Sequence, residues 1–153
     1  MYEGILKQVY EELEKGNRVC FVTLTEVKGS SPGKQGAIMA FFKDGTIKGT
    51  IGGGLVEHSV INKCRDCIKS GEDFNFEYSL NEESLEATMK CGGYIKGYIK
   101  VFKPKPKLLI IGGGHIGHAL YKISNSLDFY SIVVDDRSEF ANKERFKGVD
   151  EVY

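Results

Sequence analysis

The stretch LLIIGGGHIG, residues 108–117, runs from a wholly apolar segment directly into a glycine-rich turn. A short apolar segment of this kind is typical of a parallel strand that is covered on both faces. Residues 116–127 then have helical spacing, and residues 131–134 have the composition of a second strand. Because strand, glycine turn and helix follow in this order, the stretch predicts the opening of a Rossmann-type nucleotide fold.

Three glycines of this turn are each required for a different physical reason. Gly112 permits the tight turn, Gly114 lets backbone N–H groups approach a pyrophosphate, and Gly117 lets the helix pack close to the strand. The N-terminus of the helix then faces the anionic phosphate. Asp135 follows about 20 residues later, where this fold has the carboxylate that accepts hydrogen bonds from a ribose diol. His115 lies inside the turn and faces either a ligand or solvent.

The second domain is short for this fold. Residues 108–153 hold one strand–helix–strand unit, a short helix expected within 140–146 and a last strand at 151–153, whereas a dinucleotide fold has two such halves. The sheet is completed by a second copy of the chain, by the first domain or by residues outside this sequence, and we predict a homodimer with intimate contact between the Rossmann segments. The turn itself favours NAD(P) or another nucleotide, the alternative being a turn that keeps its geometry without a ligand.

A linker separates this segment from a first domain. Residues 103–107 read Lys-Pro-Lys-Pro-Lys, and the two prolines favour extended backbone. The expected organisation is a first domain at 1–103, a linker at 104–107 and a partial Rossmann domain at 108–153. In the first domain, the pattern predicts helices at 2–15 and 55–70 and strands at 18–27, 37–42, 46–51, 74–78 and 94–102. The fold class is α/β, with an N-terminal α+β domain rich in glycine turns and then a partial parallel sheet.

Composition excludes several classes of function. Lys plus Arg and Asp plus Glu both total 21, so the chain has no net field that would attract nucleic acid or anionic lipid. The first residues lack a signal peptide, and no apolar run approaches the ~20 residues that span a bilayer. We therefore expect a cytoplasmic protein without nucleic acid or membrane partners, whose thiols are kept reduced.

The cysteines divide into two groups. Cys64 and Cys67 lie within a predicted helix near His58, and no second pair stands at the spacing of a four-ligand zinc site. Plain packing is therefore favoured over a metal or redox pair. Cys91 follows Lys90 and precedes two glycines, so a cation and backbone N–H groups are expected to lower the pKa of its thiol. Cys91 is either a functional thiol or a core residue.

Four glycine-rich motifs occur in order along the chain. They are Gly29-Ser30-Ser31-Pro32 with Gly36-Ala37-x-Met39, Gly49-Thr50-Ile51-Gly52-Gly53-Gly54-x-x-Glu57, Cys91-Gly92-Gly93, and Gly112-Gly113-Gly114-His115 leading to Val134-Asp135-x-Arg137. Together they resemble the XdhC/CoxI family, the accessory proteins of xanthine dehydrogenase and related molybdenum hydroxylases. The chain departs from the family where Gly33-Lys34 follows the Ser-Ser-Pro step, a place where arginine is frequent, and in its shorter Rossmann segment.

The resemblance implies a carrier rather than a turnover enzyme. Such a carrier binds molybdenum cofactor (molybdopterin) and passes its sulfurated form on, so the implied partners are a molybdenum hydroxylase apoenzyme and a cysteine desulfurase. The alternatives are an NAD(P)-dependent oxidoreductase and a ligand-free regulatory dimer. The resemblance assigns cofactor binding in the first domain to Ser30, Ser31, Gly52, Gly53, Gly54, Glu57, Cys91, Gly92 and Gly93. The two serines equally suit a role in capping their own turn, and Glu57 suits a role in starting its helix.

Overall fold

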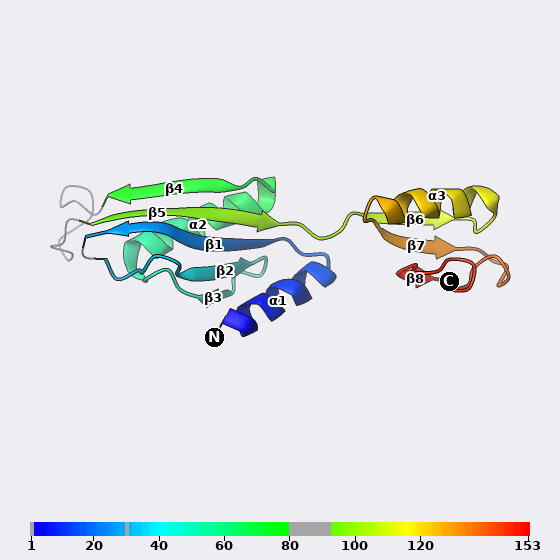
Figure 1. The fold of residues 1–153 in the computed structure, drawn as a ribbon, viewed down its shortest axis with the longest axis horizontal. Coiled ribbons are helices and arrows are strands. Elements are labelled where there is room, and N and C mark those ends of the chain that lie inside the picture. Colours follow the sequence, from blue (N-terminus) through cyan, green and yellow to red (C-terminus); the bar gives the residue numbers. More distant parts are fainter. Residues whose placement is uncertain (1, 30, 80–92) are drawn as a thin grey trace. The chain divides into compact units, whose positions relative to one another are not determined.

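The computed structural model describes residues 2–29, 31–79 and 93–153 (Figure 1). The chain divides into two compact units, Met1–Pro104 and Lys105–Tyr153. The division falls within the Lys-Pro-Lys-Pro-Lys segment. Among the described residues, no helix has the length and apolar character needed to cross a membrane.

The first unit is built on an antiparallel five-stranded sheet of order β3-β2-β1-β5-β4. The long central strand β1 (Val19–Lys28) pairs with β2 (Ile38–Phe42) on one side and β5 (Tyr94–Phe102) on the other. The edge strands are β3 (Ile47–Gly49) and β4 (Phe74–Ser79). A tight turn joins β2 to β3, and there the carboxylate of Asp44 accepts the N–H of Thr46 at 2.9 Å.

One helix covers each face of this sheet. Helix α1 (Tyr2–Glu14) buries Ile5 and Val9 in a cluster with the β1 and β2 residues Val19, Ala40 and Phe42. Helix α2 (Gly54–Ser70) buries its apolar side in a larger cluster on the opposite face. The members contributed by α2 and β1 are Val60, Cys64, Cys67, Cys20, Val22 and Leu24. Successive β1 side chains therefore serve two cores, as the period of two in a strand requires.

Three cysteines among the described residues are free and buried: Cys20, Cys64 and Cys67. The thiol of Cys20 donates to the carbonyl of Cys64 at 3.4 Å. A hydrogen bond between the side chains of Cys20 and Cys64, together with burial, raises the pKa of the Cys64 thiol far above its ordinary value. Neutral thiols packed in a core are poor metal ligands and poor nucleophiles, which favours the packing interpretation. Among the described residues, no group of three or more His, Cys, Asp or Glu side chains is arranged to hold a metal.

The second unit is a three-stranded parallel sheet of order β6-β7-β8 with one helix. Strand β6 (Lys107–Ile111) leads through the glycine turn to α3 (His115–Ser126), and β7 (Tyr130–Val134) pairs with β6 in parallel register. Strand β8 (Glu151–Val152) adds to the far side of β7. The core consists of Ile110, Tyr121, Val133, Phe146 and Val149. This is the strand–helix–strand unit that the sequence predicts, and it leaves β6 at the edge of the sheet.

One expectation for this unit is wrong, and another stays a prediction. Strand β6 has cover on one face within the unit, since Leu109 and Ile111 are 55% and 82% exposed, so cover of its other face from outside the segment stays a prediction. Residues 140–146 form turns and no helix. The physical reason lies in Asn142, whose side-chain NH₂ donates to two backbone carbonyls while its oxygen accepts the N–H of Arg145. These local bonds replace the backbone ladder of a helix.

Candidate functional site

Glycine-rich segments of the first unit meet at one end of its sheet. Lys28, the last residue of β1, pairs with Tyr94, the first residue of β5, and Tyr94 also pairs with Ser79 at the end of β4 (Figure 1). The loop after β1 and the buried Gly93 before β5 therefore lie at the same end. The predicted site residues Ser30, Cys91 and Gly92 lie outside the described residues.

The loops after β1 and after β3 touch backbone to backbone. A Cβ atom added to Gly52 would lie 2.4 Å from the nitrogen of Gly33, and one added to Gly33 would lie 2.3 Å from the carbonyl oxygen of Ile51. Real side chains do not tolerate such distances, so both positions require glycine. Gly53 differs, because no described atom lies within 4 Å of its added Cβ. The contact thus leaves an open stretch of backbone at the start of α2.

Glu57 holds the second of these loops in shape. Its Oε2 atom accepts the hydroxyl of Thr50 at 2.5 Å and the N–H groups of Ile51 at 2.9 Å and Gly53 at 3.2 Å. The hydroxyl oxygen of Thr50 in turn accepts the N–H of Gly52 at 3.1 Å. A carboxylate near a helix N-terminus is favourable, and here it also takes up amides that a bound anion would use. The geometry favours Glu57 as a residue that positions the loop.

Ser31 also bonds within its own loop. Its hydroxyl accepts the N–H of Gly33 at 3.2 Å. This bond is the one expected if Ser31 caps its own turn. Two further bonds tie the same loop to β1: the side chain of Gln35 donates to the carbonyl of Thr25, and the N–H of Gly36 donates to the carbonyl of Leu24. These two bonds hold the C-terminal end of the loop against β1.

The glycine turn of the second unit has the geometry expected of the fold. Gly112 has a φ of 103° and donates its N–H to the carbonyl of Val134 at 2.7 Å. A Cβ atom on Gly117 would lie 1.9 Å from the carbonyl oxygen of Gly112, so only glycine allows α3 to pack here. Gly114 is the N-cap of α3, and the next residue, His115, is exposed. The packing role predicted for Gly117 is thus present.

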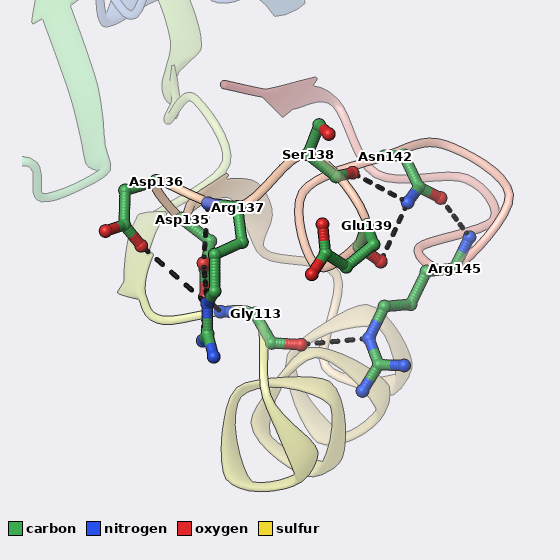
Figure 2. Close-up of polar contacts among 8 residues, drawn as sticks. All are labelled: Gly113, Asp135, Asp136, Arg137, Ser138, Glu139, Asn142 and Arg145. Carbon is green, nitrogen blue, oxygen red and sulfur yellow. Dashed lines mark hydrogen bonds and ion pairs between the residues drawn. The ribbon is translucent and has the colours of Figure 1, made fainter.

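Asp135 is fully engaged by protein groups (Figure 2). Its Oδ2 accepts the N–H of Gly113 at 2.7 Å and Nη2 of Arg137 at 3.0 Å, while Oδ1 accepts the N–H and Nε of Arg137 at 3.0 and 2.9 Å. These four bonds fill the about four acceptor positions of a carboxylate. The Arg137 side chain, followed by the two backbone N–H groups, holds the pKa of Asp135 well below its ordinary range. A ribose diol would have to displace Arg137 to reach this carboxylate.

The loop after β7 contributes residues that sequence reasoning missed. The carbonyl oxygen of Phe140 lies 2.0 Å from where Gly113 would carry a Cβ, and Nε of Arg145 donates to the carbonyl of Gly113 at 2.9 Å (Figure 2). The guanidinium of Arg137 stacks over the Phe140 ring at 4.1 Å. Arg137 was part of the recognised motif but had no assigned role. Phe140 and Arg145 lie in an aperiodic loop, where spacing gives no signal.

An open groove of about 650 Å³ runs along β6 and the start of α3. Its lining combines the glycine turn with apolar side chains. Members of this lining include Leu109, Ile111, Gly112, Gly114, Ile116 and Arg137. The groove therefore has the turn at one end and an apolar strand edge along its length.

The contact between the two loops of the first unit can be tested with a matched pair of substitutions. Gly52→Ala places a methyl group against the backbone of Gly33, whereas Gly53→Ala meets only the strain of a positive φ. We expect Gly52→Ala to lower the free energy of unfolding by about 1–3 kcal/mol more than Gly53→Ala, the usual range for overpacking. Urea denaturation followed by NMR signals of β1 measures the difference. Equal effects would mean that the loops do not touch.

The Asp135–Arg137 interaction predicts a dependence of stability on pH. Because the native pKa of Asp135 is depressed, its stabilising effect is present above the ordinary pKa of 3.8 and is lost as the pH falls below that value. Asp135→Asn should therefore destabilise the second unit near neutral pH, and the gap to the unsubstituted protein should narrow in acid. Amide hydrogen exchange of β6 and β7 measures this. Asp136→Asn is the control: this carboxylate also lies 3.7 Å from Nε of Arg137, but its side chain is 97% exposed, so the pair contributes little. An equal effect of the two substitutions would mean that Asp135 contributes no more than an exposed charge.

Comparisons with known proteins agree with the motifs. Residues 12–79 match the model of the XdhC and CoxI family, and residues 108–153 match the XdhC Rossmann domain. Two curated relatives come from Escherichia coli K12. "Uncharacterized protein YqeB" is 32% identical over 80% of this chain and 23% of its own length, and "Molybdenum cofactor insertion chaperone PaoD" is 31% identical over 61% of this chain and 30% of its own.

A solved structure shares the fold. The crystal structure of a protein named as a xanthine dehydrogenase from Bacillus halodurans superposes on this chain with a TM-score of 0.50 at 19% identity. The superposition covers 94% of this chain and 66% of that one. The chain spans about a quarter to a third of the length of the two curated relatives. The two family models match in the expected order, the first within the first unit and the second within the second unit. The chain belongs to the XdhC and CoxI family.

Proposed function

We propose that this chain binds molybdenum cofactor and hands it to the apoenzyme of a xanthine dehydrogenase-type molybdenum hydroxylase. The observation that carries the proposal is the backbone contact between Gly33 and Gly52 at the end of the first sheet where Gly93 also lies. Membership of the XdhC and CoxI family and the likeness to PaoD, which is named as a molybdenum cofactor insertion chaperone, support it.

The chemistry of these loops suits such a cargo. Molybdopterin carries a phosphate and a pterin, which backbone N–H groups and small hydroxyls recognise well. The open backbone at Gly53 and the exposed Gly54 admit a ligand group close to the chain, and Glu57 keeps that backbone in place by accepting the N–H of Gly53. Ser30 and Ser31 offer hydroxyls to the phosphate or pterin edge. Cys91 is proposed to lie near the metal-dithiolene end, with Gly92 and Gly93 beside it.

The proposed partners follow from this role. A carrier of sulfurated cofactor works between a cysteine desulfurase and the hydroxylase apoenzyme, and we propose that it does so in the cytoplasm as a non-catalytic chaperone. The first domain then holds the cargo. Any nucleotide role falls to the turn of the second unit, at Gly112, Gly114, His115, Gly117 and Asp135.

The geometry of the second unit gives no support to the NAD(P)-dependent alternative. The carboxylate that would bind a ribose is filled by Gly113 and Arg137. This arrangement favours a turn that keeps the fold without a dinucleotide. We therefore propose that the second unit serves mainly in assembly.

A homodimer is the proposed form of that assembly. Strand β6 ends the sheet and offers its backbone groups along one edge, which favours pairing with another chain. Exposed apolar side chains line the groove along β6 at Leu109, Ile111, Ile116 and Leu120. Ile123 and Leu127, also exposed, follow at helical spacing from Ile116 and Leu120. Such a continuous apolar strip on a soluble unit is typical of a protein interface.

Light scattering tests the dimer. We expect the protein to have twice the mass of its chain and Ile111→Glu to convert it to monomer, because a charge cannot be buried unpaired in an interface. Leu6→Glu, at a 55% exposed position of α1, is the control and should leave the mass unchanged. A stable monomer in the unsubstituted protein would exclude the dimer without affecting cofactor binding.

Cofactor uptake tests the main proposal. Protein purified anaerobically should take up molybdopterin, detected by native mass spectrometry, and Cys91→Ala should weaken retention about tenfold, the equivalent of losing about 1.4 kcal/mol. The control is Cys67→Ala, which removes a thiol that is buried against the sheet.

The outcomes separate the parts of this proposal. Unchanged retention by Cys91→Ala would remove the cysteine from the site and leave uptake in place. Absence of uptake by the unsubstituted protein would contradict the carrier role and favour the ligand-free regulatory dimer. Tight NAD(P) binding with turnover of a carbonyl compound would instead favour the oxidoreductase.

A further inference from the structure

The first unit has a cavity near the start of β1, at the opposite end of this strand from the glycine loops. Its volume is about 740 Å³. Three segments line it: residues 16–18 before β1, residues 43–45 in the turn between β2 and β3, and the C-terminal part of α2. Phe41 and Ile68 form its apolar floor. The proposed cofactor role makes no use of this cavity.

The charged residues of the lining are mostly cations. Arg18, Lys43, Arg65 and Lys69 face one acidic residue, Asp44. Oδ1 of Asp44 is already engaged, because it accepts the N–H of Thr46 at 2.9 Å and the hydroxyl of Thr46 at 2.7 Å. In a chain whose charges balance overall, this is a local positive excess.

Arg18 is held in a fixed orientation. Its Nη1 donates to the carbonyls of Ile68 and Lys69, each at 2.9 Å. These bonds use the two hydrogens of Nη1 and leave the Nε–Nη2 edge, which is the edge that binds a phosphate in a bidentate manner. A Cβ atom on Gly71 would lie 3.2 Å from both Cζ of Arg18 and Cε of Lys103. Lys103 thus adds a further cation beside Arg18.

Stabilising the C-terminus of α2 does not account for all of these charges. Cations near a helix C-terminus are favourable, and Arg18 and Lys69 serve that purpose. Lys43 comes from the β2–β3 turn, and Arg65 lies before the last turn of α2, where it donates to Asn62 and its Cζ lies 5.9 Å from the centre of the Phe41 ring. Cations from three separate elements therefore surround one cavity.

We propose that this cavity binds a small polyanion that carries a pyrophosphate group. Its volume is within the about 300–1,000 Å³ of small-molecule sites. The arginine forks supply directional bonds to phosphate oxygens, and the lysines supply point charges. This site stands independently of the cofactor role proposed for the glycine loops.

Calorimetric titration of the full chain with inorganic pyrophosphate at low salt tests the site. The variant Lys43→Gln with Lys69→Gln should bind about tenfold more weakly, as expected for a loss of about 1.4 kcal/mol. The control is Lys7→Gln with Lys28→Gln, which removes the same charge at exposed positions of the first unit outside the cavity lining. It should bind within about twofold of the unsubstituted protein, because distant exposed charges are screened.

Amide NMR spectra locate the bound pyrophosphate. Shifts at Gly16, Asn17 and Gly45 with an unchanged melting temperature of the cavity variant are the expected result. Absence of binding, equal weakening by the two variants, or shifts centred on residues 52–54 or 112–117 would each overturn the site.

Discussion

The backbone contact between Gly33 and Gly52 fixes the geometry of the first unit where its glycine loops meet. A side chain on Gly52 would need the space of the Gly33 backbone, and a side chain on Gly33 would need the space of the Ile51 carbonyl group. The loop after β1 can therefore approach the start of α2 only through glycine, and Ile51, buried between them at 2% exposure, anchors the contact to the core. The position of α2 over the sheet, and of the open backbone at Gly53, depends on this approach.

The second unit uses a charged group for the same purpose. Asp135 joins the end of β7 to the turn after β6 through the N–H of Gly113, and Arg137 closes over it. Arg145 and Phe140 approach the same glycine from the following loop. A fold that elsewhere keeps this carboxylate for a ribose here uses it to bind its own chain. Both units thus combine a close backbone approach at glycine with a carboxylate that accepts backbone N–H groups, Glu57 in the first unit and Asp135 in the second.

Local patterns in the sequence predicted most elements to within one or two residues, because helical spacing and strand composition are local properties. Local patterns do not predict contacts between residues far apart in the sequence. Nothing in the spacing of Gly33 and Gly52, for example, indicates that these residues touch. One face of β6 is exposed within its unit, and an apolar run does not reveal what covers it. The turns at 140–146 depend on the side-chain bonds of Asn142, which periodicity does not detect. Family motifs identified Asp135 and Arg137 but not that the two side chains pair.

Glu57 has a consequence for how the start of α2 behaves when something binds there. With three donors on one carboxylate oxygen, residues 50–53 are ordered before any ligand arrives. Binding to a preorganised loop loses little conformational entropy, and release does not require the loop to refold. Exchange at such a site is then limited by breaking contacts with the ligand, so the loop can load and unload repeatedly without passing through a disordered state.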